Sequence, residues 1–150
     1  MKRKIFSLFC LAFAFLLCSC TDGGGKKSDF AYYFALDKDE SENVLLYAVM
    51  KDGEKTEDNI FLEKIEGDDI NRVYTEFFDK FKDVYTGTVK EYAVSETLGE
   101  KGMTDFKTYL TNSPKLPAKR KTVSIKNAEN YIGEKTAEEK EKFERKNEKD

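Results

Sequence analysis

The acidic run from Asp37 to Glu42 has the residue types that could bind a hard cation. Asp37, Asp39 and Ser41 would supply oxygen ligands at alternate positions, as the first residues of a calcium-binding loop do. Such a loop needs a glycine at its sixth position and a glutamate at its twelfth, and these positions hold Glu42 and Ala48. The pattern therefore fails, and we interpret the run as a solvated turn without a metal.

Two adjacent carboxylates, Asp68 and Asp69, precede the clearest helical pattern of the chain. An aspartate at this position caps the N-terminus of a helix, and its negative charge interacts favourably with the helix dipole. The 150 residues include no histidine, and all three cysteines lie at or before position 20. These absences exclude histidine-based general-base catalysis, a Cys/His zinc site and a disulfide framework in the exported chain. We therefore predict no catalytic residue, no metal ligand and no cofactor.

The first 20 residues have the pattern of an export signal. Three basic residues at positions 2–4 precede an apolar run from Ile5 to Leu17. As a helix, these 13 residues span roughly 20 Å, less than the roughly 30 Å hydrocarbon core of a bilayer. The run therefore predicts a cleaved signal peptide and not a membrane-spanning helix.

The end of this run, Leu17-Cys18-Ser19-Cys20, resembles the lipobox of bacterial lipoproteins, in which a leucine and a small residue precede the lipidated cysteine. The resemblance implies that signal peptidase II removes residues 1–19 and that Cys20 is acylated on its sulfur and on its new amine. Two or three acyl chains anchor a protein stably, because each buried methylene contributes about 0.8 kcal/mol. Cys18 fits poorly as the lipidated residue, because Leu17 would then stand where a small residue is needed. The alternative is an ordinary secretory signal that leaves a free thiol.

Residues 20–29 are predicted to be the lipidated cysteine and a flexible tether. Positions 21–29 contain no hydrophobic residue and include three consecutive glycines. In diderm bacteria, an aspartate directly after the lipidated cysteine retains a lipoprotein in the inner membrane. Thr21 occupies that position here, so the resemblance favours the outer membrane.

Residues 30–126 are predicted to form one globular domain. Apolar runs bounded by turn residues predict strands at 30–36, 43–51, 54–66 and 88–95, and an edge strand at 122–126. Asp52-Gly53 is typical of a tight turn between the second and third of these strands.

The clearest helix is predicted from Ile70 to Tyr85, where eight apolar residues fall on one helical face. Gly87 is placed to end this helix, and a shorter helix is predicted at 103–110. The aromatic stripe could line a hydrophobic groove, but we interpret it as core that packs across the sheet. The predicted fold class is α+β, a small antiparallel sheet packed by one long amphipathic helix.

The chain becomes basic and then highly charged after residue 114. Five bases and no acid lie between residues 115 and 126, namely Lys115, Lys119, Arg120, Lys121 and Lys126. Residues 30–114 carry 10 bases and 19 acids, so the basic segment either lies on this acidic body or binds anionic lipid or another envelope protein. An acidic exported protein is not expected to bind nucleic acid. Residues 127–150 are predicted to be a charged tail, partly helical or disordered. Residues 134–150 of this tail have too few hydrophobic residues to pack on the domain, so we expect their deletion to leave its stability nearly unchanged.

Together the signal, the size and the Lys/Glu/Asp-rich, Trp-free composition are similar to the small antigenic outer-membrane lipoproteins of spirochaetes. We predict a lipid-anchored protein of the outer membrane that acts as a binding, structural or surface antigen module and not as an enzyme. The alternatives are an accessory lipoprotein of an envelope assembly complex and a carboxylate-based hydrolase. Two acids converging in a pocket would favour the hydrolase.

Overall fold

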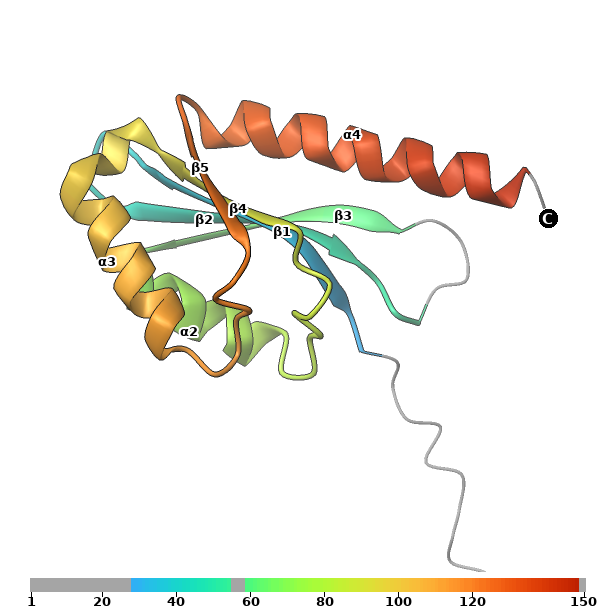
Figure 1. The fold of residues 1–150 in the computed structure, drawn as a ribbon, viewed down its shortest axis with the longest axis horizontal. Coiled ribbons are helices and arrows are strands. Elements are labelled where there is room, and N and C mark those ends of the chain that lie inside the picture. The colour runs from blue at the N-terminus through green and yellow to red at the C-terminus, as the bar shows by residue number, and fades with distance from the viewer. Residues whose placement is uncertain (1–27, 55–58, 149–150) are drawn as a thin grey trace, which may run out of the picture.

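The computed structural model describes residues 28–54 and 59–148, which form a five-stranded sheet with helices on both faces (Figure 1). The predicted signal peptide, Cys20 and the tether up to residue 27 lie outside the described residues. Helices α2 and α3 cover one face of the sheet, and α4 crosses the other (Figure 1). The prediction of a domain that mixes α-helices with a β-sheet is confirmed.

The first three strands, β1 (Phe30–Lys38), β2 (Val44–Lys51) and β3 (Ile60–Gly67), form an antiparallel meander. The predicted turn after β1 is present and is held by the Asp39 carboxylate. This carboxylate accepts hydrogen bonds from the backbone N–H of Ser41 at 2.8 Å and of Asn43 at 2.9 Å. The connection from β2 to β3 is longer than the predicted tight turn, because β3 begins only at Ile60.

The sheet is mixed, so the prediction of a small antiparallel sheet is wrong. Strand β4 (Glu91–Ser95) pairs in parallel with β1, and β5 (Lys121–Ile125) pairs in parallel with β4. The strand order is β3-β2-β1-β4-β5. Each of the last two strands is entered through a helix that lies across the sheet, and such a crossover places the next strand parallel to its neighbour.

Helix α2 (Ile70–Lys80) begins where the sequence predicts, because the Asp69 carboxylate accepts the backbone N–H of Arg72 at 2.7 Å. It ends earlier than predicted and not at Gly87. The chain leaves the helix so that the backbone of Tyr85 can bond to the start of β1. Its N–H donates to the carbonyl of Asp29 at 2.7 Å, and its carbonyl accepts the N–H of Ala31 at 3.1 Å.

The second helix on this face, α3 (Gly99–Asn112), follows a short 3-10 turn, Glu96–Leu98, and is longer than the predicted helix at 103–110. Aromatic rings fill the space between the two helices and the sheet. The ring of Phe34 on β1 meets Phe77 of α2 edge to face at 5.1 Å, and Tyr92 on β4 meets Phe106 of α3 at 5.4 Å. The interpretation of the aromatic stripe as core is therefore confirmed for α2.

The opposite face is covered by α4 (Ala128–Asn147). The prediction that residues 134–150 do not pack is wrong for Glu139, which is buried, and for Phe143, which packs on the core of this face. Ala128 and Ile132 of α4 are fully buried against Ala35 and Val49 of the sheet, and Phe143 packs at its far end. The reason is that β1 and β2 carry buried apolar side chains on both faces, so the sheet needs a second cover that helices on one face cannot supply. Among the residues described, no helix is both long enough and apolar enough to cross a membrane.

Candidate functional site

Strands β1, β4 and β5 are parallel, and their carboxyl ends meet at one edge of the sheet. At this edge β1 is followed by a hairpin turn into its neighbour β2, whereas β4 is followed by the crossover helix α3, which leads to β5 on the other side of β1. Open sheets with parallel strands bind ligands at such a switch in strand order. The side chains at this edge are therefore the first candidate site.

Asp37, near the end of β1, accepts three hydrogen bonds from separate segments of the chain. Its Oδ1 accepts the hydroxyl of Thr97 at 2.6 Å and the backbone N–H of Lys38 at 2.8 Å, and its Oδ2 accepts the backbone N–H of Ala128 at 3.0 Å. Burial would raise the pKa of Asp37, but hydrogen bonds, with that from Thr97 the strongest, outweigh burial and lower this pKa.

These contacts give Asp37 a structural task. Ala128 is the first residue of α4, so the carboxylate lies at the positive end of the helix dipole and ties the helix to β1. The interpretation of the whole acidic run as a solvated turn is wrong for Asp37, although it fits the exposed Glu40 and Ser41. Within the part of the chain that the structure describes, no group of acids is arranged to hold a metal ion.

A pocket of about 540 Å³ lies beside this edge, between the ends of β4 and β5 and the start of α3. Glu96 and Glu100 both line it, together with Ser95 and Thr104. Both glutamates are exposed, so water reaches their carboxylates. The pocket offers hydrogen bonds and negative charge to a ligand.

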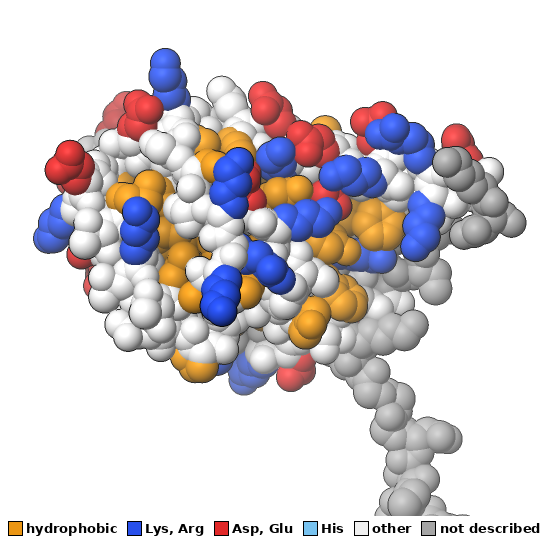
Figure 2. All heavy atoms as spheres, viewed as in Figure 1, with side chains coloured by type: hydrophobic (Ala, Val, Ile, Leu, Met, Phe, Trp, Pro, Cys, Tyr) orange, Lys and Arg blue, Asp and Glu red, His pale blue; other side chains and the backbone are white. Residues whose placement is uncertain are grey.

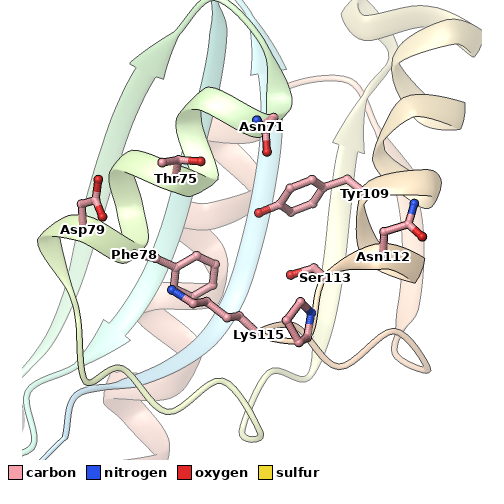
Figure 3. A pocket seen from close by; sticks show the side chains of 9 residues that line it. Asn71, Thr75, Phe78, Asp79, Tyr109, Asn112, Ser113 and Lys115 are labelled. Carbon is pink, nitrogen blue, oxygen red and sulfur yellow. The ribbon is translucent and has the colours of Figure 1, made fainter.

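A second concave surface runs between α2 and α3 on the outer side of the aromatic core (Figure 3). It consists of two adjoining pockets, of about 380 and 390 Å³, that share Asn71, Tyr109 and Asn112. At one end the Lys115 ammonium lies 4.7 Å from the centre of the Phe78 ring (Figure 3). The surface has an apolar floor, and amides and hydroxyls on its rim can form hydrogen bonds with a ligand.

The third cluster lies under α4 and was not anticipated from the sequence. Glu139 is only 3% exposed, and its Oε1 lies 2.6 Å from the Lys90 ammonium, 3.1 Å from that of Lys142 and 3.3 Å from the Tyr33 hydroxyl. Burial would raise the pKa of Glu139, but the two lysines outweigh it and lower this pKa. The signal for this cluster is the spacing of Glu139 at seven and eleven residues from Ile132 and Ala128, which places all three on one helical face.

The basic segment before β5 is exposed and only partly neutralised. The guanidinium of Arg120 donates to the carbonyls of Val89 at 2.7 Å and Gly87 at 3.0 Å, so this residue holds two loops together. Lys121 lies 3.3 Å from the Glu91 carboxylate but remains 73% exposed. The interpretation that the segment lies on acidic groups of the body therefore fits Lys121, whereas Arg120 contacts backbone carbonyls instead.

Comparisons with known protein families, with curated proteins and with solved structures return no match to this chain. The chemistry of its own residues is therefore what supports a function.

Proposed function

We propose that this chain is a lipid-anchored protein of a bacterial cell envelope, with a globular domain that acts by binding. The observation that carries the proposal is the sequence Leu17-Cys18-Ser19-Cys20 at the end of a basic and then apolar segment. The domain supports the proposal by its position in the chain. Its first strand begins at Phe30, which leaves the short segment 21–29 to connect lipid and sheet.

The anchor is tested by labelling cells with a radioactive fatty acid. We expect Cys20→Ser to abolish the label and to leave the precursor uncleaved, because only Cys20 follows a small residue. Cys18→Ser is the matched control, since it removes a neighbouring thiol and should leave labelling intact. Unchanged labelling of the Cys20 variant would overturn the proposal.

We propose the outer membrane as the location, because Thr21 and not aspartate follows the lipidated cysteine. The variant Thr21→Asp should move the protein to the inner-membrane fraction of a sucrose gradient, and Thr21→Ser should not. Proteolysis of intact cells then separates two roles. Digestion of the domain in intact cells would support a surface antigen, and protection until the outer membrane is disrupted would support a periplasmic accessory protein.

We propose binding and not catalysis for the domain itself. The two carboxylates with lowered pKa values, Asp37 and Glu139, are both held by donors that fix α4 to the sheet. The two acids that share a pocket, Glu96 and Glu100, are exposed, so a carboxylate-based hydrolase has no shielded acid there. The groove between α2 and α3 instead has the apolar floor and polar rim of a binding surface.

A further inference from the structure

The two ends of the sheet differ in charge. At the carboxyl ends of β1, β3, β4 and β5, segments 37–43, 66–69, 96–100 and 126–129 carry ten acids and two bases. We call these segments the acidic edge. At the opposite end, the loops that lead into β4 and β5, residues 81–91 and 113–121, carry six bases and two acids. The other described segments at this end, residues 28–29 and 51–54, carry three acids and one base, so the excess of bases is confined to the two loops that lead into β4 and β5. We call these two loops the basic edge.

The chain enters the sheet at the end where the basic edge lies. Residues 28 and 29 precede β1, and the backbone of Asp29 bonds to Tyr85 in the loop before β4. The register places Tyr33 of β1 beside Glu91 of β4, and Glu91 beside Lys121 of β5. The amino ends of β4 and β5 are therefore level, and β1 begins three residues before them at the same end of the sheet. Figure 1 shows the start of β1 and both loops on the lower side of the domain.

The bases at this end are accessible to a partner. Lys115, Lys119 and Lys121 are exposed, and the buried Leu116 fixes their segment to the body. Tyr85 is 54% exposed beside them, with its ring set edge to face against Phe30 at 6.1 Å. Figure 2 shows Lys and Arg side chains gathered over β5 and the adjoining surface, with hydrophobic side chains among them. Exposed bases with an aromatic ring are the side chains that suit a lipid headgroup region.

The length of chain outside the domain sets the distance to the membrane. Ser28 lies eight positions after Cys20, and even a fully extended chain of eight steps spans at most about 29 Å. The end of the sheet that carries the basic edge is therefore held close to the lipid surface once Cys20 is acylated. An anionic surface attracts the basic edge and repels the acidic edge, so charge favours one orientation.

We propose that the basic edge rests on the anionic lipid headgroups of the anchoring membrane, so that the acidic edge and its pocket face away from the lipid. The proposal rests on the proposed acyl anchor, and it adds an orientation and a second, electrostatic contact. Arg120 contributes by positioning, because its guanidinium is bonded to the carbonyls of Gly87 and Val89. Lys115, Lys119 and Lys121 make the contact with the headgroups.

The test uses the acylated protein in vesicles, with a fluorophore on a single introduced cysteine. Cys20 is the only cysteine from position 20 onward, so the introduced thiol is the only one free once Cys20 is acylated. Ala118→Cys places the label on the basic edge, and Ser41→Cys, which is also exposed, places it on the acidic edge. The vesicles contain phosphatidylglycerol and phosphatidylcholine, with a fraction of lipids that carry a quencher on the headgroup.

We expect the label at 118 to be quenched at least about twofold more than the label at 41, because the basic edge lies within a Debye length of the surface. The difference should disappear in about 1 M salt and in the triple variant Lys115→Gln/Lys119→Gln/Lys121→Gln. The matched control Lys101→Gln/Lys107→Gln/Lys126→Gln removes the same charge from other exposed positions and should keep the difference. Equal quenching at both positions, or no effect of the first triple variant, would overturn the proposal.

Flotation with the vesicles in high salt tests the anchor separately, because acyl chains resist salt and an electrostatic contact does not. A protein that does not float in high salt would overturn the proposed anchor. The protein without an anchor can still be mixed with phosphatidylglycerol vesicles at low salt. The labels at positions 41 and 118 would then report whether the acidic or the basic edge contacts the lipid. Each lysine removed should then weaken vesicle binding roughly fivefold.

Discussion

Helices α2 and α3 cover one face of the sheet with stacked aromatic rings, whereas α4 covers the other with a mostly charged helix. On the first face, the side chains of Tyr74, Phe77 and Phe106 are almost completely buried. On the second, α4 buries Ala128, Ile132 and Glu139. The Asp37 carboxylate accepts the backbone N–H of the first residue of α4, and the Glu139 carboxylate in the middle of the helix contacts Lys90. Burial of aromatic side chains therefore stabilises the packing of α2 and α3. The packing of α4 depends more on specific hydrogen bonds and ion pairs.

The largest expected effect comes from removing the cover of the second face. Truncation after Lys126 deletes α4 and exposes the apolar face that includes Tyr33, Ala35 and Val49. We expect the cooperative transition in a urea titration to be lost, because the apolar side chains on this face of β1 and β2 would then lie in water. Removal of only Lys149 and Asp150 is the control. A truncated protein that unfolds cooperatively at the same midpoint would show that α4 is dispensable.

A single change on the aromatic face should have the next largest effect. Phe77 is completely buried between Phe34 and Phe78, and Phe77→Ala should lower the free energy of unfolding by roughly 3–5 kcal/mol. Leu62→Ala serves as the control, because Leu62 is 43% exposed and its truncation should cost much less. Equal losses for the two variants in a denaturant titration would contradict the proposed core.

On the α4 face, Glu139→Ala should lower the free energy of unfolding by about 1–3 kcal/mol. The loss is smaller than for a fully buried ion pair, because the side chains of Lys90 and Lys142 are 42% and 52% exposed and can turn to water. Glu141→Ala removes a carboxylate that is 64% exposed on the same helix and should have little effect. If denaturant titrations gave the same free energy of unfolding for the two variants, the ion pairs of Glu139 would not stabilise the packing of α4.

The hydrogen bond between the N-terminus of α4 and Asp37 should depend on pH. The folded state lowers the pKa values of Asp37 and Glu139, so their stabilisation is present above the unfolded values, about 4, and is lost as pH falls through the folded values. Asp37→Asn should cost roughly 1–2 kcal/mol at pH 7, and the difference from the wild type should shrink below pH 4. Thermal midpoints measured between pH 2 and 7 test this, and a constant difference would contradict it. Glu40→Asn is the exposed control.

The smallest expected effect concerns a hydroxyl on the aromatic face. Tyr74 is completely buried, and its hydroxyl has no hydrogen-bond partner among the residues described. Tyr74→Phe removes this unsatisfied group and keeps the ring, so stability should stay constant or rise by up to about 1 kcal/mol. Tyr92→Phe is the contrasting variant, because the Tyr92 hydroxyl donates to the carbonyl of Pro117 at 3.2 Å. A larger loss for Tyr74→Phe than for Tyr92→Phe would reverse the argument.

The elements of the aromatic face were predictable because their signals are local. The spacing of Ile70, Val73 and Phe77 predicts the face of α2, and Asp69 marks its start. The end of α2 was not predictable, because Tyr85 leaves the helical pattern to bond with Asp29 and Ala31, which are more than fifty residues away in the chain. The parallel pairing of β4 and β5 depends in the same way on where each crossover helix packs.

By itself, the sequence determined the predicted signal and lipobox, the apolar runs of β1 and β2, and the aromatic face of α2, because each depends on neighbouring residues. Only the tertiary structure decided that α4 packs on the sheet. Its hydrophobic residues are too few to predict burial, and the carboxylate of Glu139 is stable there only because Lys90 and Tyr33, from distant segments, meet it. The separation of an acidic edge from a basic edge is likewise a property of the sheet, since strand direction brings together charges that lie far apart in the chain.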